Sequence, residues 1–187
     1  QGDAEAQFQL GMNYRTGKGV NKDELQALTW LNEAAWQGHA RAQYHLGLMY
    51  RNGDGVSQDD REAARWYKAA AERGESKAQN NLGNLYISGE GVPQDYVLAH
   101  KWFNLAGANG NELGIKNRDQ LAGRLSDVQV AEAQALARAW HNRNAGPARS
   151  YAAAVAREAA ASSRGDDVDQ QGDRSPSWFS RWRGSRQ

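Results

Sequence analysis

The sequence predicts an all-helical repeat protein, an α-solenoid made of antiparallel helix pairs. Three observations support this fold class. One motif occurs three times at a constant spacing of 36 residues. Each copy contains two stretches whose apolar residues recur at the period of a helix. Each copy also has a Gly-x-Gly-Val loop between those stretches, and because one copy cannot bury its apolar face alone, neighbouring copies are expected to stack.

The repeated motif defines three units, expected at residues 3–38, 39–74 and 75–110, without a gap between them. Each unit has an Ala-Gln pair, a Leu-Gly pair, a Tyr, the loop, an Asp, an Ala and a Trp at matching places. The positions are Ala6, Ala42 and Ala78; Gln7, Gln43 and Gln79; Leu10, Leu46 and Leu82; Gly11, Gly47 and Gly83; Tyr14, Tyr50 and Tyr86; Asp23, Asp59 and Asp95; Ala27, Ala63 and Ala99; Trp30, Trp66 and Trp102. So many coincident positions exclude a chance similarity.

Within each unit, the loop residues predict where the two helices end and begin. The first helix is expected to end at the first loop glycine, such as Gly53, because glycine adopts the left-handed conformation that ends helices. The second helix is expected to begin at the Asp, because its carboxylate caps free backbone N–H groups. Asp59 with Glu62, and Asp23 with Gln26, are capping-box patterns. Ala and Gly on the facing arcs allow the two helices to approach closely, and one Trp and one Tyr per unit fill the remaining space.

The repeat pattern weakens after Gly110, as expected of a terminal cap. Asn111 is expected to begin one capping helix and Ser126 a second, so that the caps occupy residues 111–144. The second helix is expected to run through Val128, Ala131, Ala135, Leu136 and Trp140. Residues 145–187 are expected to contain an Ala-rich segment, a linker and a tail with Trp and Arg.

These motif positions resemble the Sel-one-like repeat family, relatives of tetratricopeptide repeats with a longer loop between the helices. The resemblance covers about residues 3–110. It implies a right-handed α-solenoid that serves as an adaptor or scaffold in a bacterial protein. Gln1-Gly2 aligns with Gln37-Gly38, which ends a second helix. The chain is therefore expected to be a fragment that lacks an upstream repeat, and a natural mature start is the alternative.

Composition and motifs argue against nucleic-acid binding and catalysis. The net charge of +1 provides no basic excess that would recruit nucleic acid. The chain contains no cysteine, which excludes a disulfide framework and a thiolate metal site. It has no H-E-x-x-H, G-x-S-x-G or P-loop motif, and its Gly-x-Gly-Val loops join two helices, whereas phosphate-binding loops follow a strand. We therefore expect no enzymatic activity, no metal and no cofactor.

A solenoid of helix pairs presents a concave groove lined by the first helix of each unit. If Ala42, Leu46 and Tyr50 face the core, the opposite arc lines this groove. The candidate partner-binding residues there are Arg15, Arg41, Tyr44, Leu48, Arg51, Asn52, Lys77, Asn80 and Asn84. Since Tyr, Met and Arg are enriched in interfaces, the groove is predicted to bind a peptide with apolar side chains and acidic groups or a free C-terminal carboxylate. Phe8 and Met12 lie on the same arc and either join the groove or pack against a missing upstream repeat.

A second candidate contact site lies near the C-terminus, where Trp178, Phe179 and Trp182 share one helical face. Such a segment is suited to a partner's groove, to the chain's own solenoid or to a membrane surface, and the alternative is a tail without a role. Membrane contact is expected only through this tail.

The leading functional prediction is a monomeric scaffold or adaptor that binds a protein or peptide. One alternative is an anchoring or regulatory fragment of a larger envelope-associated protein, acting through the tail. A hydrolase of cell-wall sugars is a third possibility, but no pair of carboxylates recurs at matched repeat positions as that chemistry would require. A bacterial envelope or secreted location is favoured over the cytoplasm.

Overall fold

The computed structural model of the protein describes residues 2–144, which form eight α-helices and contain no strand. The predicted all-helical class is thereby confirmed. The tail residues Trp178, Phe179 and Trp182 lie outside the described residues. The helices are α1 (Ala4–Thr16), α2 (Glu24–Trp36), α3 (Ala40–Asn52), α4 (Asp60–Glu72), α5 (Ser76–Ser88), α6 (Tyr96–Ala108), α7 (Glu112–Ala122) and α8 (Asp127–Asn144).

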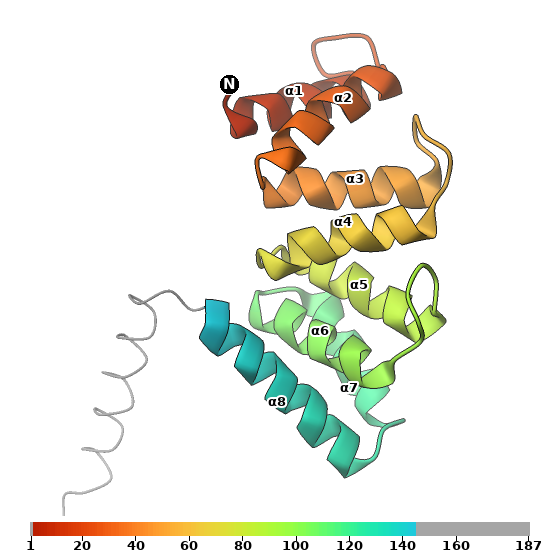
Figure 1. The fold of residues 1–187 in the computed structure, drawn as a ribbon, viewed down its shortest axis with the longest axis vertical. Helices are drawn as coiled ribbons and strands as arrows, with labels where there is room; N and C mark the ends of the chain where they lie inside the picture. The colour runs from red at the N-terminus through yellow and green to blue at the C-terminus, as the bar shows by residue number, and fades with distance from the viewer. Residues whose placement is uncertain (1, 145–187) are drawn as a thin grey trace, which may run out of the picture. The chain divides into compact units, whose positions relative to one another are not determined.

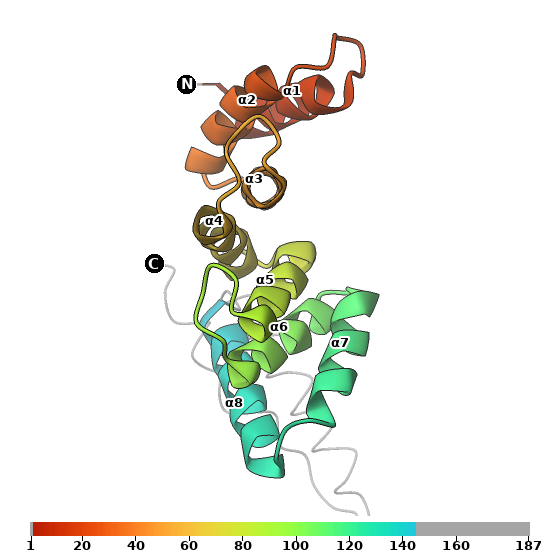
Figure 2. The same ribbon diagram turned by 90° about the vertical axis from the view of Figure 1, so that its right-hand side faces the viewer.

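The helices are arranged as three consecutive hairpins, α1/α2, α3/α4 and α5/α6, one for each repeat unit (Figure 1). The second helix of each unit also packs against the first helix of the next, so α2 contacts α3, α4 contacts α5 and α6 contacts α7. The last two helices both contact α6, and Figure 2 shows α7 and α8 on opposite sides of it. The α-solenoid is therefore extended by α7 and flanked by α8.

Each hairpin is built by the loop residues that the sequence indicated. The first helix of the second unit ends at Gly53, whose φ of 78° lies in the left-handed region. The next helix begins after Asp59, whose carboxylate accepts hydrogen bonds from Arg61 N and Glu62 N. The expected capping box is not formed, because the Asp59 N–H donates to the Tyr50 carbonyl oxygen at 2.9 Å and the Glu62 carboxylate pairs with Arg65. The Asp cap thus also ties the loop to the helix before it.

Small residues hold the two helices of each unit together. A Cβ atom added at Gly47 of α3 would lie 2.5 Å from the Tyr67 ring of α4. The equivalent Gly83 of α5 would place a Cβ 2.5 Å from the Phe103 ring of α6. The absence of a side chain on the first helix therefore admits a large side chain from the second.

The second loop glycine serves the junction between units. A Cβ at Gly91 would lie 2.0 Å from the Asp60 carbonyl oxygen of the preceding unit. The equivalent Gly55 faces the backbone of Glu24, with a Cβ-to-carbonyl-oxygen distance of 3.0 Å. Each loop therefore rests directly on the backbone at the start of the previous unit's second helix.

A buried glutamine forms a second junction contact. The Gln43 side chain donates to the Ala35 carbonyl oxygen at 3.0 Å, and Gln79 donates to the Ala71 carbonyl oxygen at 3.1 Å. Each of these bonds gives a second donor to a carbonyl at the C-terminal end of the previous unit's second helix, which also accepts from the N–H of Gly38 or Gly74. The Gln of the motif is therefore an inter-unit residue.

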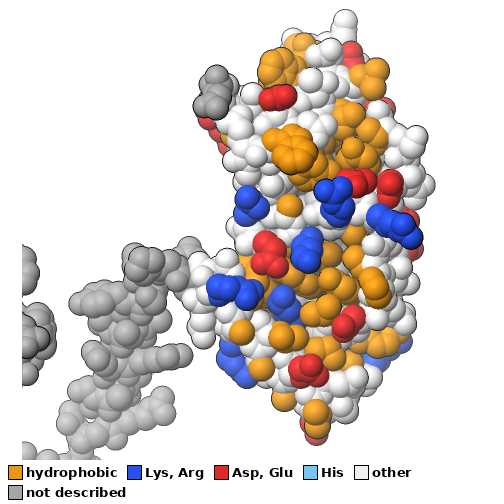
Figure 3. Space-filling model, viewed as in Figure 1, with side chains coloured by type: hydrophobic (Ala, Val, Ile, Leu, Met, Phe, Trp, Pro, Cys, Tyr) orange, Lys and Arg blue, Asp and Glu red, His pale blue; other side chains and the backbone are white. Residues whose placement is uncertain are grey.

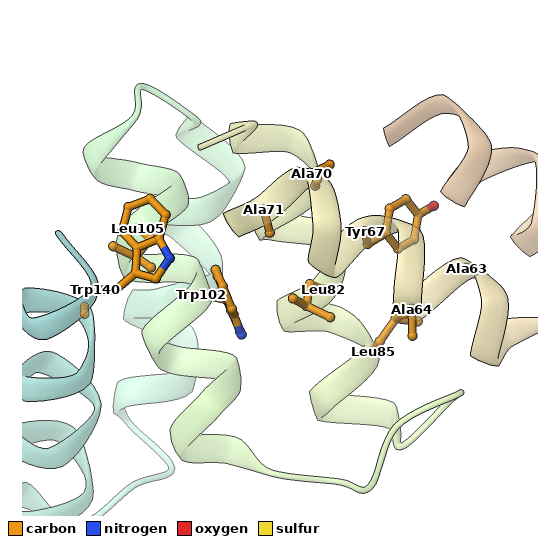
Figure 4. Close-up of a cluster of buried hydrophobic side chains, with 12 residues drawn as sticks. Ala63, Ala64, Tyr67, Ala70, Ala71, Leu82, Leu85, Trp102, Leu105 and Trp140 are labelled. Atoms are coloured by element: carbon orange, nitrogen blue, oxygen red, sulfur yellow. The ribbon is translucent and has the colours of Figure 1, made fainter. Parts of the chain in front are cut away.

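The apolar core continues from the repeats into α8 (Figure 4). Trp140 packs edge-on against Trp102 of α6 at a ring-centroid distance of 6.4 Å, and its indole N–H donates to Glu72 of α4 at 2.6 Å. The buried residues of α8 are Ala133, Ala137 and Trp140. α8 contains all five residues through which the second capping helix was expected to run, and it packs on α6 with Trp140 buried and Val128 76% exposed.

Candidate functional site

Two pockets lie side by side along the first helices of the units. The α3–α5 pocket encloses about 280 Å³, and the α5–α7 pocket encloses about 120 Å³. Asn84 of α5 forms part of both walls. The first pocket is lined by Leu48, Arg51, Asn52, Tyr67, Asn81 and Asn84, and the second by Asn84, Ile87, Asn117, Gln120, Leu121 and Arg124.

The two pockets are built from equivalent positions of successive units. Leu48, Arg51, Asn81 and Asn84 of the first pocket become Asn84, Ile87, Asn117 and Gln120 of the second when each number is raised by 36. The repeat therefore continues into α7, although the sequence motif has weakened there. The pockets form one groove along α3, α5 and α7.

Four of the predicted partner-binding residues meet in the α3–α5 pocket. Leu48, Arg51, Asn52 and Asn84 all line it, and Asn52 and Asn84 are exposed. The sequence reasoning missed Tyr67 and Asn81, which complete the same pocket. The position of Asn81 could have been found by carrying the groove arc one residue further around α5.

Tyr67 forms the buried part of this pocket. Its side chain is 0% exposed, and its hydroxyl group has no hydrogen-bond partner among the described residues. Burial raises the pKa of Tyr67 to about 12, and the nearby Asn81 side chain opposes the shift. The phenol therefore stays protonated at neutral pH and retains its capacity to donate.

The groove arginines take part in contacts between units. Arg51 of α3 donates to the Glu90 carboxylate at 3.0 Å, and Arg15 of α1 lies 4.0 Å from the Asp54 carboxylate. Glu90 and Asp54 occupy the variable position of their Gly-x-Gly-Val loops, so the two ion pairs are equivalent. These pairs are partly exposed, and each stabilises the fold by about 1 kcal/mol or less.

The first junction differs from the later two because a histidine fills it. The Arg15 guanidinium donates to His45 Nδ1 at 2.7 Å. Burial, followed by the charges of Arg15 and Arg41, lowers the pKa of His45 to about 4, so the imidazole is neutral at neutral pH. His45 is half-buried against Phe8.

Two of the predicted groove positions face the next unit. Asn80 is only 6% exposed, and its side-chain oxygen accepts from Asn117 of α7 at 2.9 Å. Tyr44 is half-buried and packs against the core cluster that includes Ala78 and Leu82 of α5, and it also contacts Tyr67 of its own unit with a ring-centroid distance of 6.0 Å. The expectation of a free side chain is therefore wrong for Asn80 and only partly met for Tyr44, because this helical position packs on the following unit.

Phe8 occupies the position of the first unit that is equivalent to Tyr44 and Asn80. Its ring is 1% exposed and stacks on His39 at 4.7 Å, so Phe8 belongs to the core of the first two units. Neither alternative considered from sequence, a groove residue or a contact to an upstream repeat, describes it. Arg41 lies over the Phe8 ring at 4.6 Å, and Lys77 is exposed but lines neither pocket.

The described residues do not contain a metal-binding group or a membrane-spanning helix. Within residues 2–144 there is no group of three or more His, Cys, Asp or Glu side chains that could hold a metal ion. No helix in that range is long and apolar enough to cross a membrane. The face seen in Figure 3, the side on which α8 lies, carries Lys and Arg interspersed with Asp and Glu.

Comparison with known proteins places the repeats in a family. The family model of the Sel1 repeat matches residues 4–39, 40–75 and 76–111, which confirms three tandem units of 36 residues. The chain belongs to the Sel1 repeat family. Sel1 repeats generally form scaffolds for protein–protein interaction and are typically non-catalytic. A search among curated proteins gave no match.

Several solved structures share the Sel1 fold. A Sel1 repeat protein from Oxalobacter formigenes is 36% identical with a TM-score of 0.61, over 62% of this chain and 48% of that one. A protective antigen present in uropathogenic Escherichia coli strains, which displays an SLR fold, is 33% identical with a TM-score of 0.73, over 93% of this chain and 36% of that one. Cysteine-rich protein B of Helicobacter pylori, 23% identical with a TM-score of 0.53 over 60% of this chain and 86% of that one, shares the fold alone. The chain thus spans less than half the length of the first two proteins.

Proposed function

We propose that this Sel1 repeat chain is a scaffold that binds a segment of a partner protein in the groove along α3, α5 and α7. The observation that carries the proposal is the pair of pockets built from equivalent positions of successive units. A groove with a repeating wall suits a partner segment that runs along the array and contacts one unit after another.

The lining of the groove supports binding of a polypeptide segment. Leu48, Ile87 and Leu121 supply apolar surface, and carboxamides supply groups that both donate and accept hydrogen bonds. Peptide segments present apolar side chains and unpaired backbone groups together, so they match this mixture. Asn84 stands between the pockets and is exposed, which makes it the best single position at which to block both.

The test is affinity capture with a groove variant and a matched control. The intact chain, Asn84→Trp and Lys68→Trp serve as baits in a lysate of the source cells, and circular dichroism verifies that all three are folded. Lys68 is an exposed residue of α4 that lines neither pocket. We expect a partner that is retained by the intact chain and Lys68→Trp and lost by Asn84→Trp. Equal retention by all three baits would contradict the groove proposal.

A further inference from the structure

We propose that the α3–α5 and α5–α7 pockets each bind the carboxylate of an acidic side chain, both carried by one extended segment of the partner. This inference rests on the proposed groove function and adds the chemical identity of the bound groups. It follows from the distribution of hydrogen-bond donors in the two pockets.

The α3–α5 pocket gathers donors without an acid among them. Arg51, Tyr67 and the carboxamides of Asn52, Asn81 and Asn84 all offer N–H or O–H groups, and none of the residues lining the pocket is Asp or Glu. A carboxylate accepts several hydrogen bonds and donates none, so it complements such a site. A cationic ligand would meet the Arg51 guanidinium, whose ion-pair partner Glu90 lies outside the lining of the pocket.

Tyr67 provides independent support for a ligand-binding role of this pocket. A buried hydroxyl group without a partner is unfavourable in a folded protein, and buried polar groups are nearly always paired. The Tyr67 hydroxyl is such a group, since it is buried and unpaired among the described residues, and the Tyr67 side chain forms part of the pocket wall. A carboxylate that enters the pocket would supply the missing acceptor.

The α5–α7 pocket, one unit further along, has a similar set of donors, although its arginine comes from a different position and Ile87 stands at the position equivalent to Arg51. It contains Arg124 and the carboxamides of Asn84, Asn117 and Gln120, and no acid lines it. Arg124 lies over the Tyr96 ring at 5.4 Å, a contact that leaves the N–H groups at the edge of the guanidinium plane free to donate. Each pocket therefore holds one arginine and several neutral donors.

The first junction of the array lacks this capacity. The positions equivalent to the pocket walls are Met12, Arg15, His45 and Leu48. There the Arg15 guanidinium already donates to His45 and faces Asp54. Arg51 also faces an acid, Glu90, but the two side chains are on the surface, 37% and 47% exposed. The guanidinium therefore keeps N–H groups that can donate to a ligand carboxylate. The acid-binding part of the groove is thus confined to the last two junctions.

The experiment measures peptide binding by fluorescence anisotropy. The first probe is a labelled peptide of alternating glutamate and alanine, blocked at both ends, in which an extended backbone directs every glutamate to one side. The second replaces glutamate with glutamine, and the third is the glutamine peptide with a free C-terminal carboxylate. We expect the glutamate peptide to bind at least about tenfold more tightly than either glutamine peptide. Equal binding of the blocked peptides, or of the glutamate peptide and the free-end peptide, would overturn the proposal.

Variants of the protein locate the bound carboxylates. Arg51→Gln and Arg124→Gln are each expected to weaken binding of the glutamate peptide by about tenfold. Arg61→Gln, at an exposed position of α4 outside the pockets, removes the same charge and is expected to change binding by about twofold or less. Similar losses in all three variants would show a diffuse charge effect and refute the pocket assignment.

Tyr67→Phe separates a ligand contact from a structural role. Because the hydroxyl is buried and unpaired, its removal is expected to leave the free protein at least as stable. If the hydroxyl donates to the ligand, the same variant binds the glutamate peptide several-fold more weakly. A variant of unchanged affinity would remove Tyr67 from the site.

The outcomes also separate this inference from the function on which it rests. If no peptide binds while Asn84→Trp still loses a captured partner, the groove function stands and the acidic ligand is wrong. If Asn84→Trp retains every partner and no peptide binds, both proposals fail.

Discussion

Replacing Gly91 with alanine is expected to break the junction between the second and third units, whereas the same replacement at Gly89 is expected to be mild. Both glycines belong to one loop and have left-handed φ values, 70° at Gly91 and 77° at Gly89. Alanine in that conformation costs about 1–2 kcal/mol, and both variants share this cost. They differ in what the added methyl group meets.

The difference can be estimated from the contacts of the added Cβ atom. At Gly89 the nearest heavy atom would be Gln94 Cβ at 3.5 Å, an ordinary contact. At Gly91 it would be the Asp60 carbonyl oxygen at 2.0 Å, a backbone atom that no rotamer change can move away. Overpacking of this kind adds about 1–3 kcal/mol. Gly91→Ala is therefore expected to cost about 2–5 kcal/mol in total, against about 1–2 kcal/mol for Gly89→Ala.

Urea and thermal unfolding followed by circular dichroism would measure both costs. One kcal/mol corresponds to about 2–4 °C in Tm for a chain of this size. Because repeat arrays can break at one interface before the rest unfolds, Gly91→Ala is also expected to broaden the transition. If Gly91→Ala were no less stable than Gly89→Ala, the close backbone approach would not be the reason for glycine at this position.

Two further predictions concern packing and pH. Gly47→Ala places a methyl group 2.5 Å from the buried Tyr67 ring, and it is expected to lower the free energy of unfolding by about 1–2 kcal/mol even after the gain in helix propensity. The control is Gly123→Ala, whose added methyl group would have its nearest neighbour at 3.7 Å. In the same urea experiment this control is expected to be neutral or stabilising. Burial and the charge of Arg15 lower the pKa of His45 to about 4, from 6.5 in the unfolded chain. As the pH falls, the unfolded chain therefore binds the proton before the folded chain does. The free energy of unfolding is expected to decrease by at most about 3 kcal/mol between pH 6.5 and 4. His45→Asn, which copies the residue at the equivalent position 81, is expected to reduce that loss, and an unchanged pH profile of unfolding would refute this role of His45.

The fold could be predicted from the sequence because the repeat supplies the same local signals three times. Glycine at the helix ends and Asp at the helix starts act over a few residues, so their effects are visible without knowledge of the neighbours. The four pocket residues Leu48, Arg51, Asn52 and Asn84 were found in the same way, because they lie on one arc of their helices.

The errors arose where a helix meets the next unit. Helical periodicity identifies the face that packs against the partner helix of the same unit, but the first helices also contact the following unit. Phe8, Tyr44 and Asn80 all face in that direction, and their different sizes and polarities gave no shared signal. The buried face of α8 could not be predicted from the sequence, since Ala residues occur on every side of that helix and leave little amphipathic contrast.

The contacts at the junctions connect the fold to the candidate site. Gly91 can rest on the backbone of α4 only because it lacks a side chain, and the residue before it, Glu90, is thereby held 3.0 Å from Arg51 in the groove. Gly55 and Asp54 stand in the same relation to α2 and Arg15. The variable residue of each Gly-x-Gly-Val loop is thus placed beside the groove of the preceding unit. A substitution at that residue changes the charge beside the groove without altering the glycines that form the junction, so under the proposed groove function the specificity for a partner can vary while the solenoid is preserved.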